Sequence, residues 1–183
     1  FGGQRCSAVS RVLAHESVHD ALVAALVDAA DDWDAGDLFD EDTRFAPLVS
    51  HDQADRVLDL VGDAVEKGAE LVAGGDRDGR LVEPTVLADV PHDARVLREE
   101  QFGPVAAVTR FEDEHEAVAL ANDTDLALDA AVFTTDHDRA MRVADAIEAG
   151  AVRINGAPSH GIGDVPFGGR KGSGIGREGL GYS

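Results

Sequence analysis

Short apolar runs alternate along this chain with longer segments whose apolar residues recur at helical spacing, and this alternation limits the fold more than any other feature. Helical spacing is found at 17–30, 53–67, 112–122 and 136–149, and strand-like runs lie at 7–14, 69–73, 82–90, the stretch ending at 108, 130–133 and 151–154. Such alternation favours crossover connections and parallel pairing. We therefore predict an α/β fold, with a mainly parallel sheet flanked by helices. Ligands of such sheets lie beyond the carboxyl ends of strands, where we place the segments of Glu100 and Asn155.

The length of the chain, 183 residues, is that of one domain with a hydrophobic core. The sequence shows no repeat and no low-complexity linker, so we predict a single domain over residues 1–183. The first residue is Phe1 and not Met, and we interpret the chain as part of a longer polypeptide. No apolar run is long enough to span a membrane and no signal peptide is present, which favours a cytoplasmic protein.

The net charge of −20, from 36 acidic and 16 basic residues, is the unusual bulk property. It argues against binding to nucleic acids or anionic membranes, both of which require basic patches. The acidic residues are spread over the predicted helices. They are interpreted either as an acidic surface that faces a partner or as an adaptation to a salty cytoplasm, where salt screens their mutual repulsion.

Cys6 is the only cysteine, so no disulfide can form within the chain. Gly2 and Gly3 let the backbone approach a neighbouring group closely, and Arg5 places a permanent cation beside the sulfur. A cation favours the thiolate, which is the nucleophilic form of cysteine. Two interpretations stay open on these residues alone: a reactive thiol, or a small buried apolar residue.

Glu100 and Phe102 are two residues apart, so on an extended segment they would share a face. A carboxylate there can accept hydrogen bonds from two ribose hydroxyls, and an aromatic ring can pack on a nicotinamide. The alternative is an exposed acid beside a core phenylalanine.

Three separated stretches resemble the aldehyde dehydrogenase superfamily. They read G-Q-R-C-S-A-V-S-R-V around Cys6, E-E-Q-F-G-P-V at 99–105, and P-F-G-G-R-K-G-S-G at 166–174. The resemblance implies that Cys6 is the nucleophile, that Glu100 binds the nicotinamide ribose of NAD or NADP, and that Phe102 packs near the nicotinamide ring. It also implies that Phe167 lines the aldehyde pocket.

The resemblance further implies that the chain is one partial catalytic domain. In family members the general-base glutamate, the oxyanion asparagine and the Rossmann-like cofactor-binding part lie upstream, and a last strand that joins subunits lies downstream. The full-length protein is expected to be a homo-oligomer, a dimer or tetramer. Residues 1–183 alone are expected to be inactive.

The implied function is oxidation of an aldehyde to a carboxylic acid with NAD(P)+ through a cysteine thioester. Arg5 could pair with an anionic substrate. A second arginine for a phosphorylated substrate is not evident at 159–164, so we favour lactaldehyde or a semialdehyde. The alternative is a non-catalytic α/β module on the same scaffold, which a missing upstream glutamate and asparagine would indicate.

Two further sequence patterns, one of glycines and one of histidines, are not interpreted as binding sites. Residues 174–179 match G-x-G-x-x-G, but no strand precedes them, so we interpret them as a surface turn. The seven histidines lack metal-ligand spacing and no metal is expected. We interpret His15 and His19 as surface residues, and His160 as a solvated loop residue.

Overall fold

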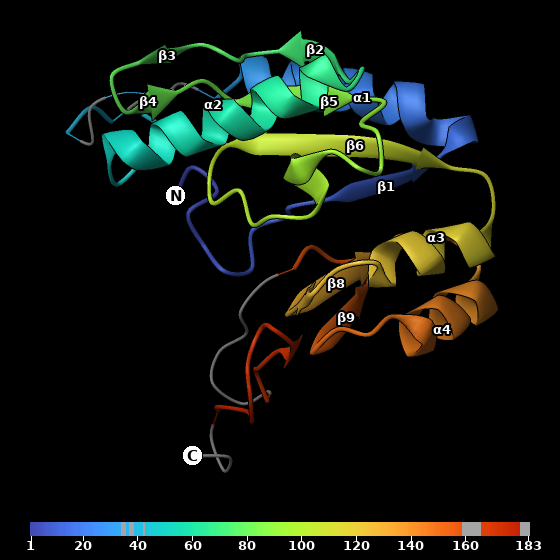
Figure 1. The fold of residues 1–183 in the computed structure, drawn as a ribbon. Helices are drawn as coiled ribbons and strands as arrows, with labels where there is room; N and C mark the ends of the chain where they lie inside the picture. The colour runs from blue at the N-terminus through green and yellow to red at the C-terminus, as the bar shows by residue number, and fades with distance from the viewer. Residues whose placement is uncertain (34–35, 37–38, 42, 159–165, 180–183) are drawn as a thin grey trace. The chain divides into compact units, whose positions relative to one another are not determined.

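The contacts between residues divide the chain into two compact units, Phe1–Glu112 and Asp113–Ser183. Figure 1 shows the computed structural model, in which residues 1–33, 36, 39–41, 43–158 and 166–179 are described. A division by contacts does not by itself set a domain boundary. The single partial domain therefore stays a prediction, and each unit is described by itself.

A four-stranded sheet with the order β1-β6-β5-β2 forms the centre of the first unit. Its strands are β1 (Val12–His15), β2 (Glu70–Ala73), β5 (Thr85–Ala88) and β6 (Val105–Phe111). β6 pairs in parallel with both β1 and β5, and only the edge strand β2 is antiparallel. The prediction of a mainly parallel sheet is thus confirmed in this unit. β5 begins directly after Pro84, as expected of a residue without an N–H to donate to the sheet.

Two long helices and one short 3₁₀ helix accompany this sheet: α1 (Glu16–Asp31), α2 (His51–Glu66) and η1 (Arg95–Leu97) (Figure 1). α2 begins where the Ser50 hydroxyl accepts a hydrogen bond from the Gln53 N–H at 3.1 Å, a typical N-cap. The buried face of α2 and the alternate residues Leu87, Val105 and Ala107 of the sheet belong to one apolar core. α1 packs against β5 and β6. A two-stranded hairpin, β3 (Arg77–Asp78) and β4 (Leu81–Val82), completes the unit.

The second unit contains the parallel pair β8 (Asp129–Val132) and β9 (Ala151–Ile154), with α3 (Glu114–Asn122) and α4 (His137–Ala146). β7 (Leu126–Ala127) pairs antiparallel with β10 (Arg170–Lys171), so a short strand does precede residues 174–179, contrary to the prediction.

The fourth helix ends at Ala146 and not near residue 149 as predicted. The side chain of Asn122 explains the early end. Its Nδ2 donates to the Ala146 carbonyl at 2.9 Å, and its Oδ1 accepts from the Glu148 N–H at 2.8 Å. Backbone groups that would otherwise continue the helix are thus hydrogen-bonded by a side chain from α3.

Candidate active site

The loop that carries Cys6 and the segment that carries Glu100 meet in the first unit. A Cβ added to Gly3 would collide with the carbonyl group of Gly103, so the two backbones are in direct contact. Gly3 also has a φ of 74°, in the left-handed region that glycine adopts without strain. The glycine before Cys6 is therefore required both by the turn and by the close approach of the second loop.

Both loops lie at the amino ends of the parallel strands that they enter, the Cys6 loop before β1 and the Glu100 segment before β6. The prediction that the Glu100 segment lies beyond the carboxyl ends of strands is therefore wrong. The physical reason is the path of the chain, because after β5 it passes through η1 and returns to the opposite end of the sheet before β6 begins. Ligand placement from topology applies to loops that leave strands, whereas this loop enters one.

Cys6 is exposed, which excludes the alternative that it is an inert buried residue of this chain. Its neighbours form a tight turn, in which the Arg5 N–H donates to the Gly3 carbonyl at 2.9 Å and the Ala8 N–H donates to the Arg5 carbonyl at 3.0 Å. Among the described residues, nothing accepts a hydrogen bond from the Cys6 N–H. The thiol is thus accessible, and a backbone donor of the same residue is not used by the fold.

Arg5 keeps its charge close to this turn. Its guanidinium carbon lies 5.4 Å from the centroid of the Phe1 ring, and its Nη2 donates to the Ser7 hydroxyl at 3.3 Å. The Arg5 side chain remains exposed, so an anionic group can reach it. The loop as a whole is tied to the unit by Gln4, whose Oε1 accepts from the Val49 N–H at 2.8 Å.

The two adjacent glutamates of the second motif differ in their surroundings. Glu99 is ion-paired with Arg95 at 2.8 Å and with Arg56 at 3.1 Å, and the hydrogen bond from Arg95 lowers the pKa of the Glu99 carboxyl below its usual range. Glu100 is exposed, and its carboxylate has no hydrogen-bond or ion-pair partner among the described residues. Of these two glutamates, Glu100 is therefore the one whose carboxylate is available to a ligand.

Phe102 does not lie on an extended segment as predicted. Its φ is 51°, in the left-handed region, and residues 99–104 form no strand. Strict alternation therefore does not hold, and the argument that Glu100 and Phe102 share one face of an extended segment is wrong. The half-buried Phe102 ring nevertheless belongs to the same short loop as the exposed Glu100.

Sequence reasoning missed two glutamines that hold this loop. Gln101 is only 2% exposed, and its Nε2 donates to the carbonyls of Ser10 and Val96 at 2.6 and 2.8 Å. Gln53 of α2 donates to the carbonyls of Gln101 and Phe102. No sequence signal identifies such residues, since a glutamine that binds backbone carbonyls fits no periodic pattern.

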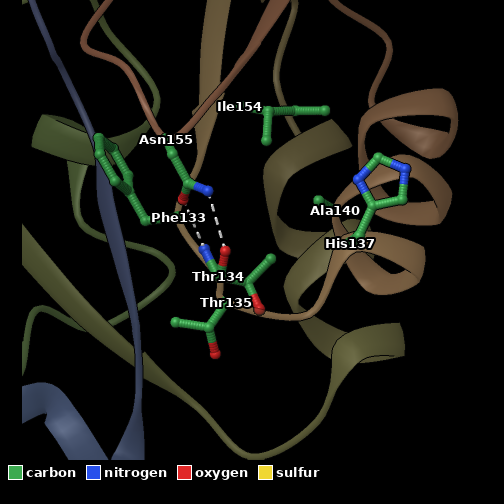
Figure 2. Close-up of a pocket in the computed structure, with 7 residues that line it drawn as sticks. All are labelled: Phe133, Thr134, Thr135, His137, Ala140, Ile154 and Asn155. Atoms are coloured by element: carbon green, nitrogen blue, oxygen red, sulfur yellow. Dashed lines mark hydrogen bonds between the residues drawn. The ribbon is translucent and has the colours of Figure 1, made fainter.

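The second unit has a pocket of about 600 Å³, lined by residues at the carboxyl ends of β8 and β9 and by the start of α4. Figure 2 shows that the Asn155 side chain faces the backbone of Thr134; its Oδ1 accepts from the Thr134 N–H at 3.0 Å and its Nδ2 donates to the Thr134 carbonyl at 3.0 Å. Asn155 has a φ of 53°. Its segment does follow a strand as predicted, but both polar atoms of its amide are already bonded to the fold.

Phe167, predicted to line the aldehyde pocket, is partly buried in the second unit, where its backbone forms a two-way bridge with Glu178 at 2.8 and 2.9 Å. The close approach of Gly150 to the Gly168 carbonyl leaves no room for a side chain at residue 150. The role of Phe167 stays a prediction.

Residues 174–179, with Gly174, Gly176 and Gly179 at positive φ, contain bends and the bridge residue Glu178, so they form an irregular and mostly exposed segment and not the predicted tight turn. His160 lies outside the described residues.

His19 is not a surface residue as predicted, because it is only 1% exposed. Its Nδ1 lies 3.1 Å from Asp20 and its Nε2 lies 3.5 Å from Asp89. Arg110 binds both of these carboxylates. Hydrogen bonds from His19 and Arg110 lower the pKa of Asp20, and the hydrogen bond from Arg110 lowers that of Asp89. The position of His19 on the buried side of α1 explains the error, since polar partners let a histidine occupy an apolar face.

The described part of the chain contains neither a candidate metal site nor a candidate membrane-spanning helix. No group of His, Cys, Asp and Glu within these residues could hold a metal ion. None of the helices described here is long and apolar enough to cross a membrane.

Comparison with known proteins gives the family. The sequence model of the aldehyde dehydrogenase family matches residues 1–183. The chain belongs to the aldehyde dehydrogenase family.

Relatives of this aldehyde dehydrogenase chain include succinate-semialdehyde dehydrogenase (NADP(+)) from Deinococcus radiodurans, which is 46% identical over 179 residues, or 96% of this chain and 37% of the relative. The 3-sulfolactaldehyde dehydrogenase of Priestia aryabhattai is 37% identical over 99% of this chain and 38% of its own length. The chain thus spans less than two fifths of the length of these relatives.

The fold is that of solved aldehyde dehydrogenases. The glyceraldehyde-3-phosphate dehydrogenase of Methanocaldococcus jannaschii, solved as a complex with NADP, superposes with a TM-score of 0.95 at 36% identity; the match covers 100% of this chain and 40% of that chain. The predicted α/β class and partial catalytic domain fold are therefore confirmed.

Proposed function

We propose that this chain is the carboxyl-terminal catalytic part of an NAD(P)-dependent aldehyde dehydrogenase that oxidises an aldehyde to a carboxylic acid through a thioester on Cys6. The observation that carries the proposal is the contact between Gly3 and Gly103. It joins the loop of an exposed cysteine to the loop of an unpaired carboxylate, Glu100. We use the term full-length protein for a protein that contains this chain together with the segments that its longer relatives have in addition.

In the first step the Cys6 thiolate attacks the carbonyl carbon of the aldehyde, so that a C–S bond forms and the carbonyl electron pair moves to oxygen. The oxyanion requires hydrogen-bond donors. The Cys6 N–H, which donates to no described residue, is suited to be one of them. An asparagine side chain from the rest of the full-length protein is proposed as the second.

The Glu100 loop fits a nicotinamide cofactor. The exposed Glu100 carboxylate has the acceptors needed for two ribose hydroxyls, and the Phe102 ring is available beside it to pack near the nicotinamide. When bound, NAD(P)+ supplies the hydride acceptor. Loss of hydride from the Cys6 adduct gives the thioester, and a water activated by a glutamate elsewhere in the full-length protein releases the acid. In this scheme, Glu100 and Phe102 hold and orient the cofactor.

The proposed substrate is a small hydroxyaldehyde such as lactaldehyde, or a semialdehyde. The exposed guanidinium of Arg5, next to Cys6 in the chain, can pair with the carboxylate of a semialdehyde, whereas lactaldehyde is neutral and would bind without this pair. The names of the relatives from Deinococcus radiodurans and Priestia aryabhattai, a succinate-semialdehyde and a 3-sulfolactaldehyde dehydrogenase, support an anionic substrate. A homo-oligomeric assembly and a cytoplasmic location are part of the proposal.

The test is Cys6→Ala in the full-length protein, assayed with lactaldehyde and succinate semialdehyde and with either cofactor. We expect aldehyde oxidation to be abolished while NAD(P)H binding, followed by its fluorescence, changes little, because the thiol forms the covalent bond and only neighbours the cofactor. Substantial turnover by Cys6→Ala would disprove the role of Cys6. An inactive wild-type protein would favour the non-catalytic module.

A further inference from the structure

Helix α2 binds three consecutive backbone carbonyls of the candidate cofactor loop. The Nε2 of Gln53 donates to the Gln101 carbonyl at 2.8 Å and to the Phe102 carbonyl at 3.1 Å, and the Nη2 of Arg56 donates to the Glu100 carbonyl at 3.2 Å. A side-chain amide has two N–H donors, and Gln53 has one for each carbonyl. The backbone on both sides of the Glu100 and Phe102 side chains is thereby held by one helix.

The helix also restricts this loop sterically. A Cβ on Gly103 would lie 2.5 Å from Cγ2 of Val57, one turn after Gln53, so that α2 and the loop backbone are in close contact. On the other side, the buried Gln101 side chain ties the loop to the Ser10 and Val96 carbonyls. The loop is therefore held from two directions.

The conformation that these bonds hold is a strained one. Phe102 has a φ of 51°, which costs a bulky residue conformational energy and persists where the surroundings over-determine it. The carbonyl of this residue is one of the two that Gln53 binds. Loss of the Gln53 amide would let the backbone at Phe102 relax. The backbone position from which the Glu100 side chain extends would then no longer be fixed.

We propose that Gln53 is a positioning residue for hydride transfer: it touches neither substrate nor reacting atoms, but holds the Glu100–Phe102 backbone in the conformation that orients the cofactor. The inference rests on the proposed function. It concerns a residue of α2 that is about 50 positions away from the cofactor motif and that carries no motif of its own.

The experiment compares Gln53→Ala and Gln53→Glu with Asp52→Ala in the full-length protein. Asp52 is the matched control, since it is exposed in the same first turn of α2 and its side chain has no partner among the described residues. Four measurements are made: the single-turnover rate of NAD(P)H formation, hydrolysis of an activated ester, the melting temperature, and amide hydrogen exchange in the protein without cofactor.

We expect Gln53→Ala to slow NAD(P)H formation by roughly 5- to 150-fold, the equivalent of losing two ordinary hydrogen bonds, with ester hydrolysis changed less than twofold. Gln53→Glu should slow it further, because a carboxylate would face two carbonyl oxygens. Without cofactor, exchange should rise at residues 100–103 in both Gln53 variants and remain unchanged in Asp52→Ala.

Parallel loss of both activities together with a lower melting temperature would show Gln53 to be merely structural and would overturn the proposal. Wild-type rates and exchange in Gln53→Ala would overturn it as well. In both cases wild-type aldehyde oxidation would leave the proposed function standing. Failure of the wild-type protein to oxidise any aldehyde would instead overturn the proposed function, and this inference with it.

Discussion

Glu99 and Glu100 show how two identical neighbours can have different roles. Glu99 lies between two arginines that lower the pKa of its carboxyl, whereas Glu100 has no partner among the described residues. A carboxylate that forms ion pairs within the protein stabilises the fold. A ligand can bind an unpaired, exposed carboxylate without breaking any ion pair of the fold. The two residues should therefore respond differently to the same substitution.

Glu100→Gln in the full-length protein should slow hydride transfer by about one to two orders of magnitude, since charge-assisted hydrogen bonds to a ribose are lost. Its melting temperature should not change. Glu99→Gln should lower the melting temperature and leave the hydride rate nearly intact. Stopped-flow NAD(P)H formation and thermal melts of both variants decide the matter; equal effects of the two substitutions on the rate would exclude the ribose role of Glu100.

The motif residues could be named from sequence, but their surroundings could not. Cys6 and Glu100 stand out because a resemblance marks them, and the structure shows both to be exposed. The burial of His19 and the hydrogen bonds of Gln53 depend on residues far away in the chain. Such contacts are set by tertiary packing, which local patterns do not encode.

Among the secondary-structure elements and loops, some glycines are required by the backbone geometry, whereas others occupy positions where a side chain would fit. Gly3 has a positive φ and lies against the Gly103 carbonyl, whereas Gly62, exposed within α2, has nothing within 4 Å of an added Cβ. The first glycine cannot be replaced without moving a loop. The second only weakens its helix, because glycine has a low helix propensity.

Gly62→Ala should therefore stabilise the protein by roughly 0.5–1 kcal/mol, measured by urea denaturation. Gly3→Ala should destabilise it and reduce aldehyde oxidation and ester hydrolysis together, since the Cys6 loop must shift. A Gly3→Ala protein with wild-type activity would contradict the contact between the Cys6 and Glu100 loops.

The ends of α1, β5 and β6 are joined by a charge cluster that should make the first unit sensitive to acid. The pKa values of Asp20 and Asp89 are lowered in the folded state, so the unfolded chain binds more protons at low pH. The stability that they contribute is complete above the ordinary aspartate pKa of about 3.9 and is lost as the pH falls through the lower folded values.

Arg110→Met removes the cation that both carboxylates share. The variant should be less stable than wild type near neutral pH, and the difference should shrink as the pH is lowered below about 4. Arg44→Met is the control, since Arg44 is exposed and has no ion pair among the described residues. Denaturant titrations between neutral and acid pH test this, and a constant difference for Arg110→Met would mean that these pKa values are not lowered by Arg110.

The order and type of the long helices and main strands followed from periodicity, whereas the element ends and the two-residue strands β3, β7 and β10 did not. The strand predicted at 151–154 coincides with β9, because a short apolar run between glycine and polar residues leaves little choice. The end of α4 depended on Asn122, which lies on another helix. The path of the chain between β5 and β6, which decided at which end of the sheet Glu100 lies, was also not encoded locally.

For the whole molecule, the sequence predicted the fold class because three motifs and the strand–helix alternation agree, and agreement between levels is what specifies a fold. The net charge is the one bulk property that this fold does not require. Ion pairs engage part of the acidic residues, such as Asp59 and Glu114, but 36 acidic residues face only 16 basic ones. Most carboxylates therefore repel one another without compensation.

Salt should consequently stabilise this protein. The screening length falls from about 10 Å at 0.1 M salt to about 3 Å at 1 M, so repulsion between surface carboxylates is largely removed over this range. Screening also weakens the ion pairs, but exposed pairs contribute little, and the repulsion outweighs them at −20. The melting temperature should rise steeply with KCl up to about 1 M and then level off.

Glu66→Gln and Glu70→Gln, combined, provide the matched test. Both residues are exposed and have no ion pair among the described residues. If repulsion between carboxylates is the cause, the double variant should melt above wild type at low salt, and the two curves should converge near 1 M KCl because screening has then removed the same repulsion in both proteins. Sucrose, which stabilises without screening, should raise both melting temperatures equally. A wild-type melting temperature that is flat in KCl would mean that the acidic residues are not an adaptation to salt, and would favour the alternative of an acidic surface that faces a partner.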